Sequence, residues 1–541
     1  MEVKNEGCLI RCPKAFQYSS IKALLNQMEN CVYKIKIDEQ QGTIFPCYIP
    51  IPFEKMYIPV LITNNHIINE KNLDEKDKEI YINLINQKRK TINLNNRIKY
   101  TKKEHDITII EIKENDGIKN FLELDDSIIN DIINNDYCNE NYEDETIYII
   151  QFPEGELWVS CGLLKKIYKG EFYFDHNCNT NLGSSGSPIL NQKNKVIAVH
   201  KGAYSDSFNR GSFLNKAIKE FIEKYKSEKL LKKFSKKYNL NSIKDTNVKQ
   251  LAIGNKIIGD EGFNDLSKIQ FNELKDFRLN CNEITDIKVL QKVRFEKLEK
   301  LHLINNNISN INVLEKVNFL ELKDLNLSTN KLSDISVLSK AKFEKLESLC
   351  LSYNKISDIS VLEKVNFKEL KELDFAANQI SDIRVLAKVE FEKLESLVLS
   401  NNKISDINVF KNVNFQELKL LLLYGNEISD IKVFEYVKFN KLKLLSLALN
   451  KITDIGVIEK VNFKELHCLG FSKNRIKDPS VLVKAKFEKL KKLSLDDNGI
   501  DEEKYSSVLS FLWEKYDCFY YSENQKVKDL KDSTSTKFFT F

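Results

Sequence analysis

The chain has little of several residues that mark particular protein classes. Of its 541 residues, only 17 are glycine and 8 are proline, which excludes collagen-like chains and proline-rich linkers. The net charge is only +5, from 83 basic and 78 acidic residues, so bulk charge does not indicate a nucleic-acid-binding protein. No apolar run approaches the roughly 18 residues of a membrane span. The first residues also lack the apolar core of a signal peptide.

The 11 cysteines show no metal-binding or disulfide pattern. No Cys-x-x-Cys pair occurs, and no cluster of cysteine and histidine has the spacing of a zinc site. Free thiols in a reducing compartment are the simplest interpretation. We therefore expect a cytoplasmic protein without a metal or another cofactor. A content of 42% apolar and 30% charged residues indicates a globular chain.

The second half of the sequence repeats every 24 residues. The pair Leu301 and Leu303 recurs in ten units, beginning with the unit around Phe277, and a degenerate unit precedes them. Leucines at alternate positions predict a short strand with one buried face in every unit. An asparagine recurs from Asn282 to Asn498, and we expect its amide to pair with backbone groups of stacked turns. A phenylalanine recurs from Phe271 to Phe487 and is expected to fill the core of the convex side.

Each unit reads L-x-x-L-x-L-x-x-N-x-I and then D-I-x-V-L-x-K-V-x-F. This pattern resembles the leucine-rich repeat of the internalin type over about half the chain. The resemblance implies a solenoid with a concave sheet, a surface that commonly binds proteins. We expect His302 and His467 to be surface residues of this half.

The outward strand positions turn apolar around the sixth to eighth units. Contiguous exposed apolar surface marks interaction sites, so this set is a candidate partner-binding patch; alternatively, these copies simply tolerate leucine. The patch consists of Val398, Leu420, Leu422, Tyr424 and Leu444, with Leu449 beyond the strand.

The first half of the sequence contains short β-branched runs separated by polar turns, which favour a barrel or a sandwich. Three of its segments carry reactive side chains. His66 follows the run at 60–63, Asp106 opens the alternating run at 107–112, and Ser185 lies in a turn flanked by glycines. The order His, Asp, Ser is that of chymotrypsin-like proteases.

Two of these segments resemble particular protease families. The T-N-N-H-I segment around His66 is similar to the histidine motif of HtrA-type proteases, and S-G-S-P-I-L-N-Q-K-N-K-V-I-A-V-H-K-G at 185–202 is similar to glutamyl endopeptidases. The resemblance covers about 35–225. The expected fold class is therefore multidomain: an all-β, chymotrypsin-like double barrel followed by a leucine-rich-repeat solenoid.

In such a site, each residue type has a defined task. His66 would remove the proton of the Ser185 hydroxyl and then protonate the leaving amine. Asp106 would orient His66 and stabilise its charged form. The backbone N–H groups of Gly183 and Ser185 would form the oxyanion hole, for which glycine permits the unusual turn. Ser184 replaces the aspartate of digestive trypsins, so activation through a new N-terminus is not expected.

The resemblance also points to a specificity pocket. In glutamyl endopeptidases and picornaviral proteases, a threonine and a histidine at the positions of Thr180 and His200 hold a Glu or Gln side chain. We expect Thr180, His200 and Gly202 to bind substrate, with cleavage after Glu or Gln; alternatively, His200 only fills space in its strand. We expect His105 and His176 to be surface residues.

The leading hypothesis is a serine endopeptidase whose substrate is recruited, or whose activity is regulated, by the repeats. The alternative is a non-catalytic recognition protein with a degenerate protease fold. The expected partners are a protein or peptide substrate and an unidentified protein on the concave face, with no nucleic acid and no transmembrane segment. The predicted organisation is a helical extension at 1–30, a protease domain at 31–225, a Lys-rich helical linker at 226–250, repeats at 251–500, a helical cap at 501–521 and a tail at 522–541.

Overall fold

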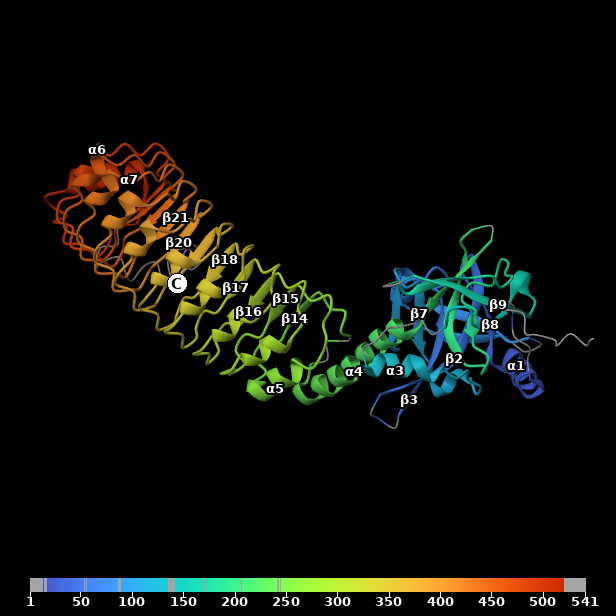
Figure 1. Cartoon of the computed structure of the whole chain (residues 1–541). Coiled ribbons are helices and arrows are strands. Elements are labelled where there is room, and N and C mark those ends of the chain that lie inside the picture. Colours follow the sequence, from blue (N-terminus) through green and yellow to red (C-terminus); the bar gives the residue numbers. More distant parts are fainter. Residues whose placement is uncertain are drawn as a thin grey trace, which may run out of the picture. The chain divides into compact units, whose positions relative to one another are not determined.

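The computed structural model describes Pro13 and residues 17–519, except 53, 55, 86–88, 135–141, 169–170, 206, 241–242 and 244. The predicted tail at 522–541 lies outside the described residues, as does most of the extension before residue 17. Contacts divide the chain into two compact units, Met1–Lys229 and Leu230–Phe541. The first is called the protease unit below and the second the repeat unit (Figure 1).

The first half of the protease unit is a seven-stranded antiparallel sheet in the order β5-β4-β1-β2-β3-β7-β6. Its inward residues are mostly isoleucine, leucine and valine with exposures near zero. The β-branched isoleucine and valine among them favour the pleated, buried surface of a strand. The strands are β1 (Tyr33–Ile37), β2 (Gln40–Pro50), β3 (Tyr57–Thr63), β4 (Glu79–Asn83), β5 (Lys90–Asn93), β6 (Lys99–Lys102) and β7 (Ile107–Glu111).

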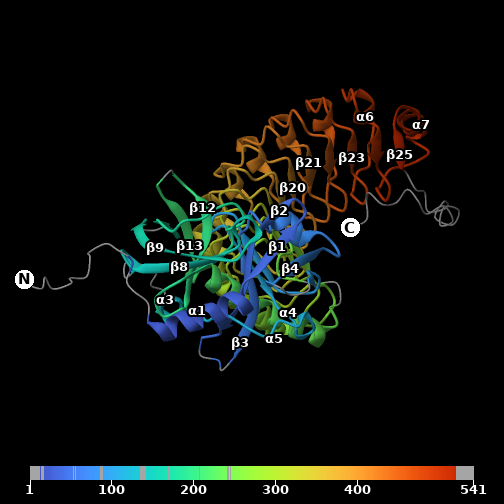
Figure 2. The same ribbon diagram turned by 90° about the vertical axis from the view of Figure 1, so that its right-hand side faces the viewer.

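The second half of the protease unit is a closed six-stranded barrel in the order β10-β13-β12-β11-β8-β9. Figure 2 shows β8, β9, β12 and β13 on one side of β1, β2 and β4 within this unit. The all-β fold class predicted for the first half of the chain is thereby confirmed. The strands are β8 (Thr146–Gln151), β9 (Trp158–Ile167), β10 (Tyr173–His176), β11 (Pro188–Leu190), β12 (Val196–Ala203) and β13 (Asn209–Phe213).

Helices cover parts of the protease unit. Of the apolar residues in the N-terminal helix, Leu24 is buried, but Ile21 and Leu25 are 41% and 52% exposed. The helix therefore contacts the unit along a narrow stripe. The helices are α1 (Tyr18–Cys31), α2 (Glu70–Asp74) and α3 (Asp126–Asn134), with 3₁₀ turns at Glu114–Asp116 and Pro153–Gly155.

Helix α4 (Asn215–Tyr238) runs without interruption through residue 225, where the sequence places a domain boundary. Its first half contributes Ile218 and Phe221 to the core of the protease unit. Its second half contributes Leu231 and Phe234 to the core of the repeat unit. The predicted Lys-rich linker is therefore in large part the second half of this helix.

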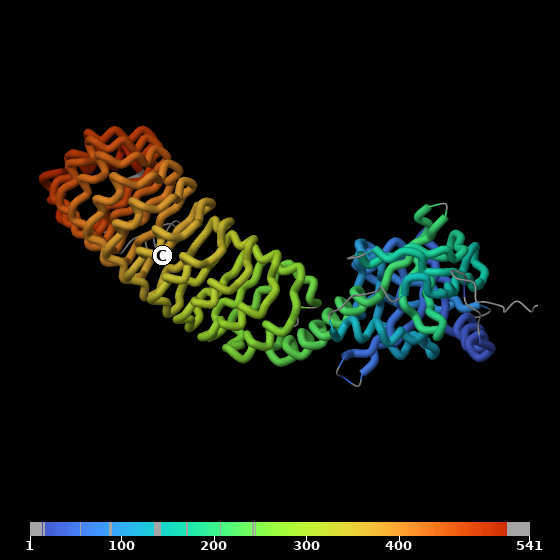
Figure 3. The backbone as a smooth tube through the Cα atoms, in the orientation of Figure 1, coloured from blue at the N-terminus to red at the C-terminus, as the bar shows by residue number. Residues whose placement is uncertain are grey.

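The repeat unit is a stack of similar coils (Figure 3), and each coil contains one short strand. The strands form one parallel twelve-stranded sheet in sequence order, and the register advances by 24 residues from β15 through β24, as in Leu325↔Leu349. Parallel pairing follows because every strand leaves its coil in the same direction. The strands are β14 (Gln250–Ala252), β15 (Asp276–Arg278), β16 (Lys300–His302), β17 (Asp324–Asn326), β18 (Ser348–Cys350), β19 (Glu372–Asp374), β20 (Ser396–Val398), β21 (Leu420–Leu422), β22 (Leu444–Ser446), β23 (Cys468–Gly470), β24 (Lys492–Ser494) and β25 (Asp517–Phe519).

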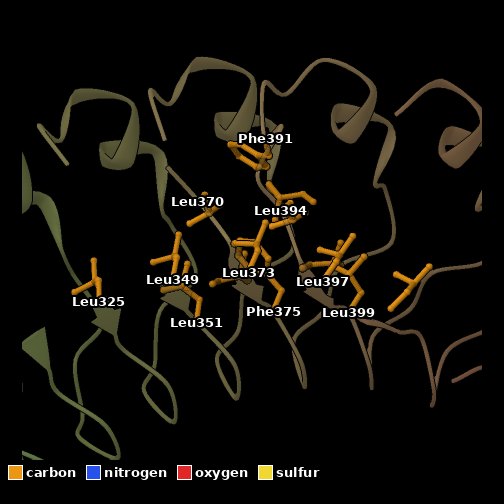
Figure 4. Close-up of a cluster of buried hydrophobic side chains, with 14 of the residues drawn as sticks. Leu325, Leu349, Leu351, Leu370, Leu373, Phe375, Phe391, Leu394, Leu397 and Leu399 are labelled. Atoms are coloured by element: carbon orange, nitrogen blue, oxygen red, sulfur yellow. The ribbon is translucent and has the colours of Figure 1, made fainter. Parts of the chain in front are cut away.

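Leucine and phenylalanine fill the space inside the coils. Leu349, Leu373 and Leu397 occupy equivalent places in successive coils, with Phe391 above them (Figure 4). The phenylalanines predicted to line the core are all buried, from 1% exposed at Phe271 to 7% at Phe487. Each coil therefore closes its core only against its neighbours, which is the general property of a solenoid.

A short helix closes the side of each coil away from the strand. The aspartate of the D-I-x motif accepts a hydrogen bond from the backbone N–H two residues later, as Asp334 does from Ser336 at 2.8 Å. This contact fixes the start of the helical turn. The helices are η4 (Lys288–Lys292), η5 (Asn312–Glu315), η6 (Ser336–Lys340), η7 (Ser360–Lys364), η8 (Arg384–Ala387), η9 (Asn408–Asn412), η10 (Lys432–Glu435), η11 (Gly456–Glu459) and α6 (Val481–Lys484).

The recurring asparagine makes the contacts expected of it. Asn402 Nδ2 donates to the carbonyl oxygens of Phe375, Leu399 and Ser400 at 3.0–3.2 Å, and its Oδ1 accepts from the N–H of Ile380 at 3.0 Å. The residue directly before each of these asparagines has φ between +52° and +69°, and only Gly425 among the ten is glycine. The sequence pattern does not reveal this left-handed position, because the amide contacts hold ordinary residues in it.

Both ends of the stack are closed. Helix α5 (Gly259–Leu266) belongs to the degenerate first unit, and Phe263 and Leu266 are buried. At the other end, α7 (Ser506–Lys515) buries Leu512, and β25 adds a strand that the predicted helical cap does not include. Trp513 of α7 is 52% exposed.

Candidate active site

The backbone register brings His66 and Asp106 together. Strands β3 and β7 pair antiparallel with Thr63 opposite Thr108, so the residues after β3 and before β7 lie at the same edge of the sheet. His66 lies in the turn after β3, and Asp106 directly precedes β7. The Nδ1 atom of His66 lies 2.8 Å from Oδ2 and 3.0 Å from Oδ1 of Asp106.

Asp106 is fixed by its surroundings. Its Oδ1 also accepts from the backbone N–H of His66 at 3.0 Å, and Asn64 Nδ2 donates to its carbonyl oxygen at 2.8 Å. Its φ is +52°, a strained value for a residue with a side chain. The Asp106 side chain is 7% exposed, whereas that of His66 is 43% exposed. The pair is thus a buried carboxylate that orients an accessible imidazole.

Ser185 lies on a turn held against the first sheet. Its carbonyl oxygen accepts from the N–H of Thr43 at 2.8 Å. Gly186 has φ +87°, and a Cβ at this position would overlap the carbonyl oxygen of Thr43 and the hydroxyl of Thr63. The turn therefore requires glycine after Ser185 and lies beside the end of β3, close to the His66 turn.

The Ser185 hydroxyl donates to the carbonyl oxygen of Lys201 at 3.3 Å. Within the described residues, no hydrogen bond joins this hydroxyl to His66. The structure thus brings His66 and Asp106 into direct contact and places Ser185 on the neighbouring turn, without a hydrogen bond between Ser185 and His66. The backbone N–H groups of Gly183 and Ser185 donate to no other group in the described part of the chain.

His200 lies on β12 next to the Ser185 turn. Its N–H donates to the carbonyl oxygen of Ser187 at 2.8 Å, and its carbonyl oxygen accepts from Gly186 at 3.0 Å. The ladder shifts register between His200 and Gly202, which turns the Lys201 carbonyl toward Ser185. Thr180 is partly exposed, and Gly202 has φ +148° with open space where a side chain would be.

His176 is a buried partner of His200, and the sequence expectation that it lies on the surface is wrong. Its Nε2 lies 3.2 Å from Nδ1 of His200, and both side chains are buried. Burial lowers the pKa of His176 to about 4. Burial, with the charges of His176 and His66, lowers the pKa of His200 well below its usual value. At neutral pH the two imidazoles are therefore uncharged.

His105 is also buried, at 3% exposed, so its predicted surface location is wrong. Its Nδ1 contacts the Tyr100 hydroxyl at 2.8 Å, which also donates to Glu220 of α4 at 3.1 Å. Desolvation lowers the pKa of His105 to about 4. The contact between Tyr100 and Glu220 spans 120 residues of sequence, so sequence spacing does not indicate it.

Other residues that support the site are not predicted from the sequence. Asn64 holds the loop of Asp106, and Thr43 anchors the loop of Ser185. Of these two residues, only Asn64 could have been identified from the sequence, because it is a polar residue between an apolar strand and His66. In the described part of the chain, no group of three or more His, Cys, Asp or Glu side chains is arranged to hold a metal ion. No helix among the described residues is long and apolar enough to cross a membrane.

The outer face of the twelve-stranded sheet, called the sheet face below, contains the apolar patch. Val398, Leu420, Leu422, Tyr424 and Leu444 are all partly exposed, and Leu449 is 50% exposed. His467 is partly exposed. His302, expected at the surface, is partly buried and its Nε2 pairs with Asp324 at 2.8 Å.

Comparisons with known proteins agree with both units. A family described as "Trypsin-like peptidase domain" matches residues 55–199, and leucine-rich-repeat families match residues 344–388, 368–412 and 440–459. The protease unit is similar to a glutamyl endopeptidase of Staphylococcus aureus, 28% identical over 166 residues, which are 30% of this chain and 45% of that protein. The chain thus spans about half the length of the curated relatives it matches.

Solved structures with similar backbones match one unit or the other. An internalin from Listeria monocytogenes is 24% identical, covers 55% of this chain and 95% of its own, and has a TM-score of 0.36. A serine endoprotease from Yersinia pestis is 12% identical, covers 39% of this chain and 68% of its own, and has a TM-score of 0.27. The chain joins a trypsin-like peptidase domain, similar in sequence to glutamyl endopeptidases, to a series of leucine-rich repeats.

Proposed function

We propose that the protein is a serine endopeptidase that uses His66, Asp106 and Ser185. The observation that carries the proposal is the contact between the accessible imidazole of His66 and the buried carboxylate of Asp106, beside a glycine-bounded turn that holds Ser185. A serine hydroxyl is a weak nucleophile unless a base removes its proton. His66 is the group in this arrangement with the accessibility and orientation for that task.

The reaction follows from these roles. His66 takes the proton of the Ser185 hydroxyl as the oxygen attacks the scissile carbonyl carbon, and Asp106 stabilises the imidazolium that forms. The unpaired N–H groups of Gly183 and Ser185 supply donors for the oxyanion. His66 then protonates the leaving amine, and water releases the acyl group by the same steps in reverse. Before attack, the Ser185 hydroxyl exchanges its bond to the Lys201 carbonyl for one to His66, since catalytic contacts commonly tighten only with substrate bound.

We propose cleavage after Glu or Gln. His200 lies beside the nucleophile turn, and its contact with His176 fixes the imidazole in place. With one ring nitrogen engaged by His176, the other remains to donate to a carboxylate or amide oxygen. Thr180 and Gly202 complete the wall of the pocket.

The repeats are proposed to recruit a protein substrate or to regulate the protease through the sheet face. The partly exposed apolar side chains around Leu422 support this role, because contiguous apolar surface marks interaction sites. We also infer a cytoplasmic location from the cysteine pattern, since the seven described cysteines with assigned state are free thiols.

A fluorophosphonate probe tests catalysis directly. Labelling of the wild type that is lost in Ser185→Ala is expected, together with unchanged labelling of Ser187→Ala. Ser187 lies in the same turn, and its buried hydroxyl has no hydrogen-bond partner among the described residues, so this variant is a matched control. Peptides that differ only at the residue before the scissile bond then test specificity. A preference for Arg or large apolar residues that persists in His200→Ala would refute the assignment of His200 to a pocket for Glu or Gln.

The second candidate is a non-catalytic recognition protein. The bond of the Ser185 hydroxyl to Lys201, rather than to His66, favours it. Absence of probe labelling in the wild type, with the protein folded and the sheet face still binding a partner, would support this alternative.

A further inference from the structure

Lys and Glu form ordered columns along the repeat unit. At one position of the 24-residue unit, Glu and Lys alternate through all ten copies from Glu273 to Lys489. Neighbouring copies pair as five salt bridges of 2.5–2.6 Å. The alternation gives this column no net charge.

A second column, called the flank column, lies directly before the strands. Its members are bonded to one another through the backbone, as Lys443 N–H is to Lys419 and His467 N–H is to Lys443 at 2.7–2.8 Å. From Lys275 to Lys419 its residues also alternate between Lys and Glu, and side chains pair between neighbouring copies. The column consists of Lys275, Glu299, Lys323, Glu347, Lys371, Glu395, Lys419, Lys443, His467 and Lys491.

The alternation ends at Lys443. The pattern requires Glu at this position, but the chain has Lys443, then His467 and Lys491. In the described part of the chain, no carboxylate forms a salt bridge with Lys443 or Lys491. We call these three residues the cationic end of the flank column. Adjacent strands are spaced about 4.8 Å apart, so Lys443 lies beside Lys419, and Lys491 lies two strand spacings beyond Lys443, at a cost in mutual repulsion.

The Glu465 carboxylate interacts with the cationic end. Lys443 and His467 contribute to lowering the pKa of Glu465, but the largest interaction of this carboxylate is its bond to Lys489 at 2.6 Å. Lys492 of β24 adds another positive charge on the sheet face.

The cationic end adjoins the apolar patch. Lys443 directly precedes Leu444, and Lys419 directly precedes Leu420, both outward residues of the sheet face. Leu422 lies two residues further along β21, opposite Ser446 of β22. The lysines of the cationic end thus border a partly exposed surface of leucine and valine. A nucleic acid would match the cations but would leave these aliphatic side chains without a suitable partner.

We propose that this combined surface binds an extended polypeptide segment that carries both Asp or Glu and apolar side chains. Its carboxylates pair with Lys443 and Lys491, and its apolar side chains cover Leu420, Leu422 and Leu444. The proposal rests on the recruiting role proposed above for the repeats, and it gives the chemistry of the recruited partner. The binding energy comes mainly from the apolar contact, and the charges select against basic segments.

The test uses the full chain with Ser185→Ala, which prevents cleavage of the bait. Random dodecapeptides displayed on phage are selected on this protein, and the enriched peptides are synthesised and titrated by fluorescence anisotropy. Motifs that combine acidic and apolar residues are expected, with affinity that falls as salt rises. Lys443→Glu restores the alternation of the flank column, so it is expected to keep or raise the unfolding temperature while weakening peptide binding at least tenfold.

Lys345→Glu is the matched control. It makes the same change of charge in the other column and breaks a bridge to Glu321, so it is expected to leave peptide affinity within twofold. Enriched peptides without acidic residues, equal weakening by the two variants, or full competition by single-stranded DNA would each overturn the proposal. Because Ser185→Ala binds without cleaving, failure of binding and failure of catalysis are read separately.

Discussion

Acid should destabilise the protease unit through His176. This imidazole is buried in the barrel, and burial lowers its pKa to about 4, against about 6.5 for an exposed histidine. A lowered pKa means that the unfolded chain binds the proton more tightly than the folded one. The stability of the neutral, buried form is therefore complete above pH 6.5 and is lost as the pH falls toward 4.

The two pKa values set the magnitude of the effect. At pH 5, a group that titrates near 6.5 in the unfolded chain and near 4 in the folded one lowers the free energy of unfolding by about 2 kcal/mol relative to pH 7.5. With a urea dependence of roughly 2–3 kcal/mol/M, the unfolding midpoint falls by roughly 1 M. His200 and His105 act in the same direction, because the pKa of each is also lowered.

The chain offers a convenient optical readout. Its two tryptophans are Trp158 in β9 and Trp513 in α7, one in each unit. In a Trp513→Phe background, urea titrations at pH 7.5 and pH 5.0 followed by fluorescence report on the protease unit alone. His176→Asn is expected to reduce the difference between the two pH values by about 2 kcal/mol.

A histidine of the repeat unit provides the control for His176→Asn. His467→Asn removes a partly exposed histidine of the repeat unit and should leave the pH dependence of the Trp158 signal unchanged. If His176→Asn retains the pH dependence of the parent protein, then the burial of neutral His176 is not its source, and the description of the paired imidazoles is wrong.

Further predictions concern packing and the nucleophile turn. Asn402→Ala leaves one buried N–H and three carbonyl groups without their amide partner and is expected to lower the stability of the repeat unit by about 3 kcal/mol in urea titrations, whereas the exposed Asn414→Ala should change it by less than about 0.5 kcal/mol. Gly186→Ala places a methyl group against a backbone carbonyl oxygen and is expected to reduce probe labelling at least tenfold; retained labelling would show that the turn adapts. Tyr100→Phe leaves the buried His105 without its hydroxyl partner, and a loss of about 1–3 kcal/mol is expected for the protease unit; an unchanged urea midpoint would refute this role.

The repeat architecture was the most predictable feature because its determinants are local and recur. Leucine alternation, the asparagine at Asn402 and its equivalents, and the buried phenylalanines each follow from one 24-residue unit. The left-handed residue before each asparagine was not predictable, since Tyr353 and Leu449 occupy it as well as Gly425. There the tertiary contacts of the amide override the ordinary backbone preference.

The candidate site was predictable to a lesser extent. The order of His66, Asp106 and Ser185 indicates a protease because each follows or precedes a recognisable strand. The burial of His105 and His176 was missed because both depend on contacts from distant strands and from α4. The bond from Ser185 to Lys201 depends on a register shift in β12, and such shifts leave no mark in apolar periodicity.

The Lys and Glu residues of the repeats follow a longer period than the leucines do. A strict 24-residue apolar repeat makes every coil equivalent, but the Lys and Glu alternation makes successive coils complementary and gives a period of two units. That period is visible in the sequence once equivalent positions are compared, and its structural reason is the pairing of cations with carboxylates between neighbouring coils. Because alternation minimises repulsion, a departure from it has a cost, and selection for stability alone does not explain Lys443. The departure coincides with the apolar section of the sheet face, which is why we locate the partner's acidic segment there.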